Sequence, residues 1–389
     1  MGLQFYLQDT MLIERLCGVG LYCLVLLVVC NGITVSKPTS VKKWLLFYAV
    51  VLAAMGFFFV PSPSTDLARL TAYMHDWSDQ SISWLVDKCA SSSTPAYIVY
   101  FWLVGQLHVD GLLPAITALI FYGLVFSCYW DFASRDSIPN KAVALGLFAF
   151  MSLGTFLQVI SGIRSYLGFV LVFRAIYTEW FKGRRLVFNL PLYILAGTMH
   201  SASLVLVVAR FLFLVFQKTN GRYGRFTAVV LAGLGVFLFA WVGGDYLAAA
   251  VNKANNYITG EAYSYVWETF IHLITVLCAI ASLRACKAVR DGSPGLHNAW
   301  FFTAATFIVS TCFLPFDYSI FLRFTTVGAL FVPLLAMSAL KPCAKDVSLT
   351  NEQMGYRRLM ISLCIIALLL ACARGDLSAY KFFLSGGAL

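Results

Sequence analysis

Apolar segments of about the length that crosses a bilayer recur along the whole chain, and they constrain its fold more than any other feature. Of the 389 residues, 60% are hydrophobic and 12% are charged, whereas a soluble domain carries about 25% charged residues. The sequence therefore predicts an all-α polytopic membrane protein, with residues 1–389 forming a single transmembrane domain.

Twelve segments are the candidate spans: 16–33, 44–60, 111–130, 141–160, 165–181, 186–199, 201–217, 226–244, 266–283, 298–314, 320–340 and 358–374. The stretch 96–106 has the length of an interfacial or re-entrant segment, so we expect it not to cross. Residues 186–217 are expected to cross twice, as a hairpin that turns near His200. A single crossing there would place the later basic clusters on the other side of the membrane.

The basic residues are concentrated between alternate spans. Six clusters hold 18 of the 28 lysines and arginines: Lys37/Lys42/Lys43, Arg135/Lys141, Lys182/Arg184/Arg185, Lys218/Arg222/Arg225, Arg284/Lys287/Arg290 and Lys341/Lys345/Arg357/Arg358. All six fall on one side if the spans alternate, and the positive-inside rule makes that side the cytoplasm. The net charge of +10 is thereby explained without a nucleic-acid partner. We expect a multi-pass protein of the cytoplasmic (inner) membrane.

Two long loops, 61–95 and 245–265, then lie outside. In the first, Ser64 or Thr65 can cap a helix that begins near Asp66. An apolar stripe (Leu67, Leu70, Met74, Trp77) and a polar stripe (Asp66, Arg69, Tyr73, Asp76) alternate at helical spacing, which predicts an amphipathic helix on the membrane surface. The polar stripe either faces a catalytic cleft, with Asp66 or Asp76 as general base, or simply faces water.

The stretch 161–180 carries two arginines within an apolar segment. Arg164 opens a span on the outer side, where it opposes the helix dipole; it either binds phosphate or snorkels to the interface. Arg174 lies ~15 Å deeper, too deep to snorkel easily, and needs a partner inside the bundle. Its role, and that of Arg210, is left open.

Three further residues lie at expected outer turns. His200 is either a packing residue or, beside Ser201 and Ser203, a proton carrier or phosphate contact. Asp317 and Arg323 flank the start of a span, where they form either a salt-bridged turn or part of an outer cationic cavity.

The stretch 252–268 combines amides with aromatic side chains, including Asn256, Tyr257 and Tyr263. Such a set suits sugar binding, although an interfacial aromatic belt would explain the aromatic residues alone. The eleven cysteines show no disulfide or metal spacing. No nucleotide-binding or metal motif occurs, so neither a metal nor a cofactor is expected.

Several of these motifs together resemble the Wzy/EpsG-type polymerases of bacterial surface polysaccharides (O-antigen and exopolysaccharide). The likeness spans roughly residues 60 to 330. It lies in the outer Asp–x–x–Arg pair (Asp66, Arg69), in "SGIRSYLGFVLVFRA" with Arg164, in "MHSASLVLV" with His200, and in "FDYSIFLRF" with Arg323. Ser161 and Ser165 stand where family members often carry Asn and Gln.

The resemblance implies a glycosyltransferase-C-like fold with outer-face amphipathic helices and a catalytic cleft facing the periplasm. It implies an enzyme that joins oligosaccharide repeat units carried on undecaprenyl pyrophosphate, without metal or cofactor. Its catalytic residues would be Asp66, His200, Arg164 and Arg323. Substrate contacts would come from eight others: Arg69, Tyr73, Asp76, Tyr166, Asn256, Tyr257, Tyr263 and Asp317.

The expected partners are the lipid-linked oligosaccharide and membrane lipid, and a separate chain-length regulator protein is left open. Two alternatives to a polymerase also stay open. One is an O-antigen ligase of related fold. The other is a transporter or flippase for lipid-linked oligosaccharide, which the absence of a clear internal repeat weakly disfavours.

Overall fold

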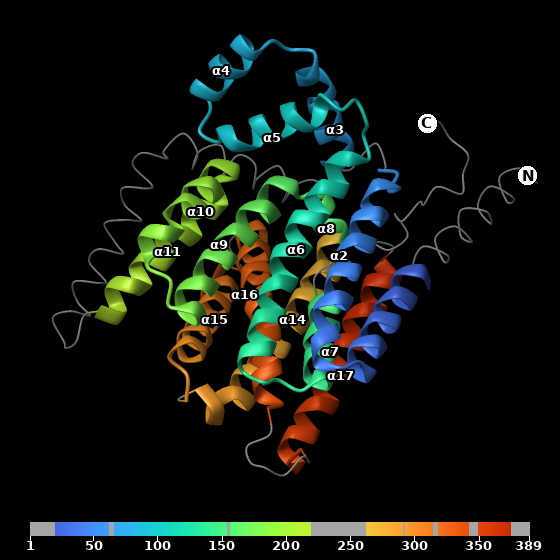
Figure 1. Cartoon of the computed structure of the whole chain (residues 1–389), viewed down its shortest axis with the longest axis vertical. Helices are drawn as coiled ribbons and strands as arrows, with labels where there is room; N and C mark the ends of the chain where they lie inside the picture. The colour runs from blue at the N-terminus through green and yellow to red at the C-terminus, as the bar shows by residue number, and fades with distance from the viewer. Residues whose placement is uncertain are drawn as a thin grey trace, which may run out of the picture.

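A computed structural model of the chain describes residues 20–61, 66–153, 156–218, 262–290, 292–313, 318–341 and 349–374 (Figure 1). These residues form helices and their connections, with no β-strand among them. The first helix covers Gly20–Val35. The labelled helices are α2 (Val41–Phe57), α3 (Asp66–Ser78), α4 (Ile82–Ala90), α5 (Pro95–Gly105), α6 (Leu112–Arg135), α7 (Asn140–Leu153), α8 (Phe156–Ser161), α9 (Ile163–Lys182), α10 (Leu186–Met199), α11 (Ser201–Lys218), α14 (Ala262–Arg290), α15 (Pro294–Phe313), α16 (Tyr318–Ala339) and α17 (Asn351–Arg374).

The predicted all-α, multi-pass architecture is confirmed. Four helices among the described residues are long and apolar enough to cross a membrane: Pro38–Phe57, Leu112–Arg135, Thr269–Cys286 and Asn351–Leu370. Shorter apolar helices accompany them, such as Leu186–Met199 and Thr325–Ala339. The expected span 141–160 falls on two helices, α7 and α8, and the span 226–244 lies outside the described residues. A count of twelve spans stays a prediction.

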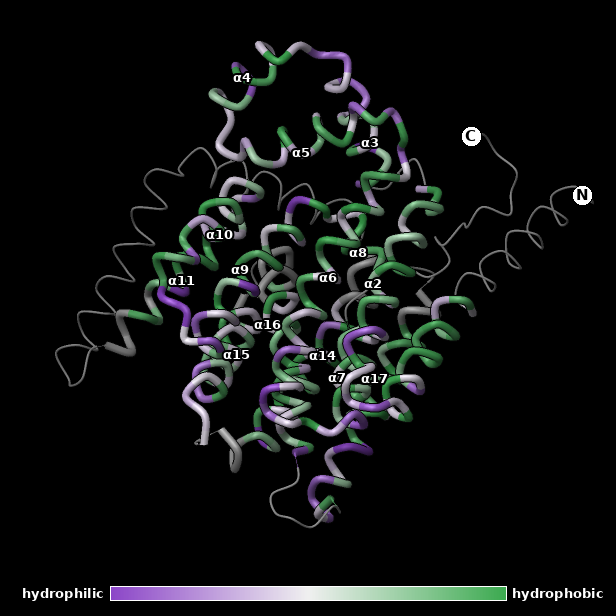
Figure 2. Tube along the Cα trace, in the orientation of Figure 1, coloured by the Kyte–Doolittle hydropathy of each residue, from purple (hydrophilic) through white to green (hydrophobic). Residues whose placement is uncertain are grey.

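Helices α3, α4 and α5 form a layer across one end of the bundle (Figure 1). Hydrophobic residues follow the middle of the bundle helices, whereas hydrophilic residues concentrate near α3–α4 and at the opposite end (Figure 2). Helix α5 has 11 residues, hence a length of ~16 Å, and it lies in this layer. This position agrees with the prediction that 96–106 does not cross.

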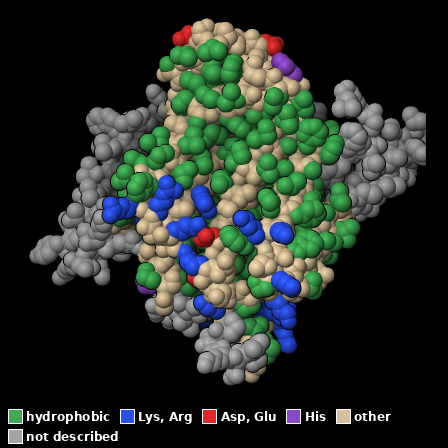
Figure 3. All heavy atoms as spheres, in the orientation of Figure 1, with side chains coloured by type: hydrophobic (Ala, Val, Ile, Leu, Met, Phe, Trp, Pro, Cys, Tyr) green, Lys and Arg blue, Asp and Glu red, His purple; other side chains and the backbone are tan. Residues whose placement is uncertain are grey.

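The Lys and Arg side chains are concentrated at one end of the bundle. On the face drawn in Figure 3 they gather on the half away from α3–α5, together with a few acidic side chains, whereas the α3–α5 end shows Asp, Glu and His side chains. Arg135 and Lys182, from two of the predicted cytoplasmic clusters, end helices α6 and α9. The arrangement agrees with the one-sided clustering expected from the sequence.

The hairpin expected within 186–217 is present as α10 and α11. His200 ends α10 with an extended backbone (φ −157°, ψ 135°), and α11 begins at the next residue. Helix α10 carries Pro191 in its interior and packs against α9 and α11. The turn therefore lies where the sequence placed it.

Gly168 allows helices α9 and α11 to approach closely. A Cβ atom there would overlap the Oγ atom of Ser203 and lie 3.2 Å from the carbonyl oxygen of Ala196. Ser203 is fully buried, so its side chain has no space to move into.

We expect Gly168→Ala to lower the stability of the detergent-purified protein by about 2 kcal/mol, the usual cost of overpacking a core. Adding Ser203→Ala, which removes the overlapped atom, should recover most of this loss. Gly123→Ala is the control, because open space surrounds that position on α6. Thermal unfolding measures all four proteins, and equal melting temperatures for Gly168→Ala and Gly123→Ala would contradict the close approach.

Candidate active site

Arg164 lies in the first turn of α9, beneath the α3–α5 layer. Its guanidinium carbon is 4.9 Å from the ring centroid of Tyr97 on α5. Among the described residues it makes neither an ion pair nor a hydrogen bond, and it is half-buried. A cation at a helix N-terminus is opposed by the helix dipole. The contact with Tyr97 offsets only about 0.5–2 kcal/mol, so the site still favours an anion.

The polar stripe of α3 points away from the buried face of that helix. The carboxylate Oδ1 of Asp66 accepts a hydrogen bond of 2.8 Å from Nη2 of Arg69, and both side chains are more than half exposed. Asp76 is exposed, and Tyr73 stacks on Trp77 with ring centroids 5.8 Å apart. The predicted separation of stripes is confirmed, because Leu67, Leu70 and Met74 are buried.

An aromatic cluster joins α3 to α5. Trp77 contacts the rings of Tyr97 and Phe101 at centroid distances of 5.8 and 6.0 Å. Since Tyr97 also covers Arg164, the α3–α5 layer contacts this arginine directly. A second link is the 2.6 Å pair between His75 of α3 and Asp110, just before α6.

His200 has a structural contact at the α10–α11 turn. Its Nδ1 accepts a hydrogen bond of 3.0 Å from the backbone N–H of Ala202 in the first turn of α11. In the neutral imidazole this leaves the proton on Nε2, so the ring has no second acceptor nitrogen. The side chain therefore acts as a helix cap in this conformation.

Tyr166, one helical turn into α9, faces the bundle interior. Its hydroxyl donates to Oε1 of Gln158 on α8 at 2.9 Å. Both residues line a pocket that is partly open to its surroundings. The pocket lies between the portions of α6, α7, α8, α9, α14 and α16 that are nearer the α3–α5 layer.

The remaining predicted site residues have no described side chain. Arg323 lies on α16 and Tyr263 on α14, near the start of each helix, but their side chains are outside the described set. Asn256, Tyr257 and Asp317 lie outside the described residues, as does most of the expected loop 245–265. Their assignment stays a prediction.

Comparison with protein families identifies the chain. Residues 41–384 match the EpsG family, which covers most of the sequence. The chain belongs to the EpsG family. This family is of the Wzy polymerase-like type, so membership indicates a polysaccharide polymerase-type role in a multi-pass membrane protein. No curated protein and no solved structure matches the chain.

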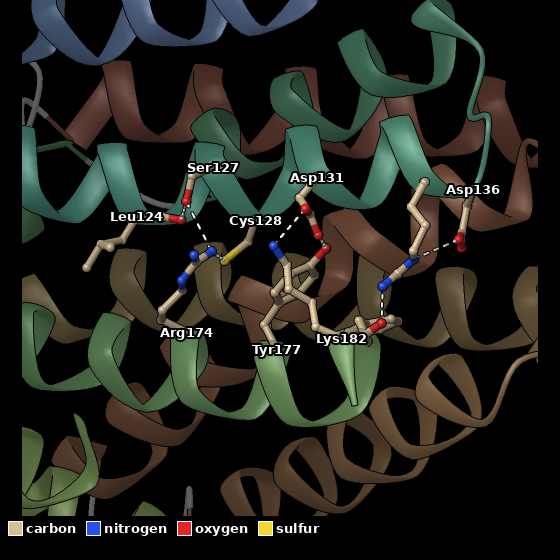
Figure 4. A network of polar contacts seen from close by, with 10 residues as sticks. Leu124, Ser127, Cys128, Asp131, Asp136, Arg174, Tyr177 and Lys182 are labelled. Atoms are coloured by element: carbon tan, nitrogen blue, oxygen red, sulfur yellow. Dashed lines mark hydrogen bonds and ion pairs between the residues drawn. The ribbon is translucent and has the colours of Figure 1, made fainter. Parts of the chain in front are cut away.

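In this EpsG-family protein, Arg174 has the partner that the sequence left unnamed. Its Nη1 lies 3.3 Å from Oγ of Ser127 and 3.2 Å from Sγ of Cys128, both on α6 (Figure 4). These partners are neutral, and the carboxylate of Asp131, one turn further along α6, instead binds Tyr177 and Lys182 at 2.7 Å each. Arg174 thus belongs to the α6–α9 contact rather than to the site around Arg164.

The EpsG-family protein also buries an ion pair that the sequence reading missed. Glu179 of α9 and Arg210 of α11 meet at 2.6 Å, and their side chains are only 5% and 4% exposed. The other carboxylate oxygen accepts from the hydroxyl of Tyr193 at 2.8 Å, and Trp180 covers the guanidinium at 5.2 Å. A carboxylate and an arginine inside neighbouring apolar spans were the available signal.

His272 is a second residue of the candidate site that the sequence analysis did not predict. It is 6% exposed, lines the pocket beside Gln158 and Tyr166, and lies 5.9 Å from the ring of Phe321. An ionisable residue within an apolar span indicates a functional site by default. That signal was present in the segment "FIHLITVL", but only the tertiary structure shows which side chains surround the imidazole.

Proposed function

We propose that this protein polymerises oligosaccharide repeat units carried on undecaprenyl pyrophosphate, by metal-independent glycosyl transfer on the outer face of the cytoplasmic membrane. The observation that carries the proposal is Arg164. It is a half-buried cation at the outer mouth of the bundle, held by an aromatic ring and not neutralised by a carboxylate among the described residues. Such a group is prepared to receive an anion.

In the proposed reaction, a hydroxyl oxygen of the acceptor unit attacks the anomeric carbon of the growing chain. The bond between that carbon and the pyrophosphate oxygen breaks, and the bonding electrons leave with the lipid pyrophosphate. Negative charge on the leaving group therefore grows in the transition state, where a fixed guanidinium stabilises it best. Arg323 is the proposed second cation, because the stretch "FDYSIFLRF" resembles the late arginine motif of these polymerases.

The acceptor hydroxyl must lose its proton. Asp66 is the better of the two proposed bases, because only its Oδ1 is bonded to Arg69 and its Oδ2 is open among the described contacts. His200 holds the N–H of Ala202 with its acceptor nitrogen and would have to release that cap before taking a proton. Tyr73, Asp76 and the residues of 252–268 remain proposed sugar contacts.

The decisive experiment supplies the purified protein, in liposomes, with the lipid-linked repeat unit as sole substrate. A polymerase converts it into a ladder of longer chains, detected by gel electrophoresis and mass spectrometry, and releases one undecaprenyl pyrophosphate per bond formed. A ligase leaves the unit unchanged until a separate acceptor is added. Movement of the unit across the bilayer without chain growth would assign the protein to transport.

The proposed orientation places the α3–α5 layer outside the cell. In a protein whose eleven native cysteines are replaced by serine, Asp79→Cys should react in intact cells with a maleimide that cannot cross the membrane. Arg184→Cys, exposed at the other end of the bundle, should react only after the membrane is opened. The opposite labelling pattern would invert the topology and rule out an external site at Arg164.

A further inference from the structure

The pocket beside Tyr166 differs in chemistry from the mouth at Arg164. Among its described lining residues there is no Lys, Arg, Asp or Glu. Its polar groups are the amide of Gln158, the imidazole of His272, and hydroxyls that include those of Thr275 and Thr325. Apart from the imidazole of His272, these groups carry no charge that could compensate an anion, and a hydrocarbon chain could not use any of their hydrogen-bonding capacity.

Aromatic rings complete the wall of the pocket. Phe121, Tyr122 and Phe150 line it from α6 and α7, and Phe121 stacks with Phe150 at a centroid distance of 6.4 Å. A sugar ring has apolar C–H faces and a rim of hydroxyl groups. A pocket that combines aromatic faces with neutral donors and acceptors therefore matches a sugar better than either a phosphate or a lipid tail.

One polar atom in the pocket lacks a partner. Thr325 is fully buried, and its Oγ1 makes no hydrogen bond with the described residues. A buried hydroxyl left without a partner is costly, and native structures usually satisfy such groups. A ligand hydroxyl in the pocket would satisfy it.

Gln158 is held so that donors remain for a ligand. Its Oε1 accepts the hydroxyl of Tyr166, and its Nε2 makes no hydrogen bond with the described residues. Tyr166 follows Arg164 by two residues, which turns their side chains to different sides of the first turn of α9. The first turn of α9 therefore presents Arg164 on one side and Tyr166, which lines the pocket, on another side.

From these observations we infer that the pocket between α6, α7, α8, α9, α14 and α16 binds a neutral sugar ring of the lipid-linked repeat unit, with Thr325, Gln158 and His272 as its hydrogen-bonding residues. The inference rests on the proposed function and adds to it a division of labour. The pyrophosphate is held at Arg164, and a sugar is selected in the pocket. This pocket then helps to determine which repeat unit the enzyme accepts.

The test compares two probes on the full-length protein in nanodiscs. One is undecaprenyl pyrophosphate carrying the repeat unit, and the other is undecaprenyl pyrophosphate without sugar. Thr325→Val removes the hydroxyl and keeps the shape, and it should weaken binding of the first probe about tenfold, the effect of one lost hydrogen bond. Binding of the sugar-free probe should not change. His272→Leu should show the same selectivity.

Two further variants separate the pocket from general effects of substitution. Thr325→Ser keeps the hydroxyl and should retain binding. Thr303→Val is the matched control, because Thr303 is equally buried and its Oγ1 also lacks a hydrogen bond, but it does not line the pocket. The control should bind both probes as the wild type does.

Each other outcome counts against the inference. If Thr325→Val weakened or strengthened the binding of both probes equally, the pocket would bind the prenyl tail or have a structural role instead. If the wild-type protein binds and polymerises the sugar-bearing probe and Thr325→Val binds this probe equally well, the assignment of the pocket is wrong but the proposed function stands. A wild-type protein that binds neither probe would overturn the proposed function and the inference with it.

Discussion

Replacing Arg164 by alanine is expected to abolish long polysaccharide chains while single repeat units still accumulate. The guanidinium is proposed to stabilise charge that develops on the leaving pyrophosphate, and loss of one such group costs about 10²–10³-fold in rate. The protein should remain folded, since the side chain contributes only one cation–π contact, worth about 0.5–2 kcal/mol. The measurement is chain length and polymerisation rate with the purified substrate.

Two variants sharpen this prediction. Arg164→Lys keeps the charge but loses the bidentate geometry, so it should retain part of the activity. Arg184→Ala is the matched control, because Arg184 also makes a cation–π contact, at 5.8 Å from Phe188, at the opposite end of α9. Normal chain length in Arg164→Ala, or a defect of equal size in Arg184→Ala, would refute the assignment of Arg164.

The largest stability effect is expected at the buried pair of Glu179 and Arg210. Glu179→Leu leaves the guanidinium buried without its carboxylate, and breaking such a pair typically costs about 3–5 kcal/mol. The double substitution Glu179→Leu with Arg210→Met removes both charges and should recover most of the loss, because an apolar replacement of similar volume is often neutral. Thermal unfolding in detergent measures all three proteins.

The control for this pair is Asp131 with Lys182, whose side chains are 25% and 39% exposed. Lys182→Ala should lower stability by no more than about 1 kcal/mol, as is usual for a solvated ion pair. The double variant could instead be less stable than the single Glu179→Leu variant. This result would show that the charges stabilise the contact between α9 and α11 through interactions other than their own ion pair.

Several parts of the fold and site followed from local patterns. The amphipathic stripe predicted that Leu67, Leu70 and Met74 are buried on α3, and they are. Helix periodicity and apolar length predicted the bundle, and the length of 96–106 favoured an interfacial or re-entrant segment, which agrees with the 11-residue helix α5. The position of Arg164 at the start of a helix was also predicted, and it lies in the first turn of α9. Each of these features depends on residues that are close together in the chain.

The contacts of the site could not be read in the same way. The ring of Tyr97 that covers Arg164 is 67 residues away in sequence, and Thr325 lines the same pocket as Gln158 across a still longer separation. Periodicity shows which face of a helix is buried but not which helix covers it. Family resemblance supplied the candidate cations, yet it gave no indication of the pocket around His272.

The sequence by itself determined that this chain is a helical membrane protein, which end of its bundle is basic, and where Arg164 enters a span. Those properties follow from hydropathy, charge distribution and the 3.6-residue period, which act locally. Only the tertiary structure decided that Glu179 meets Arg210, that Arg174 has neutral partners, and that His272, Gln158 and Thr325 share a pocket. The physical reason is that helix packing fixes these pairings, and packing depends on the surfaces of several helices at once.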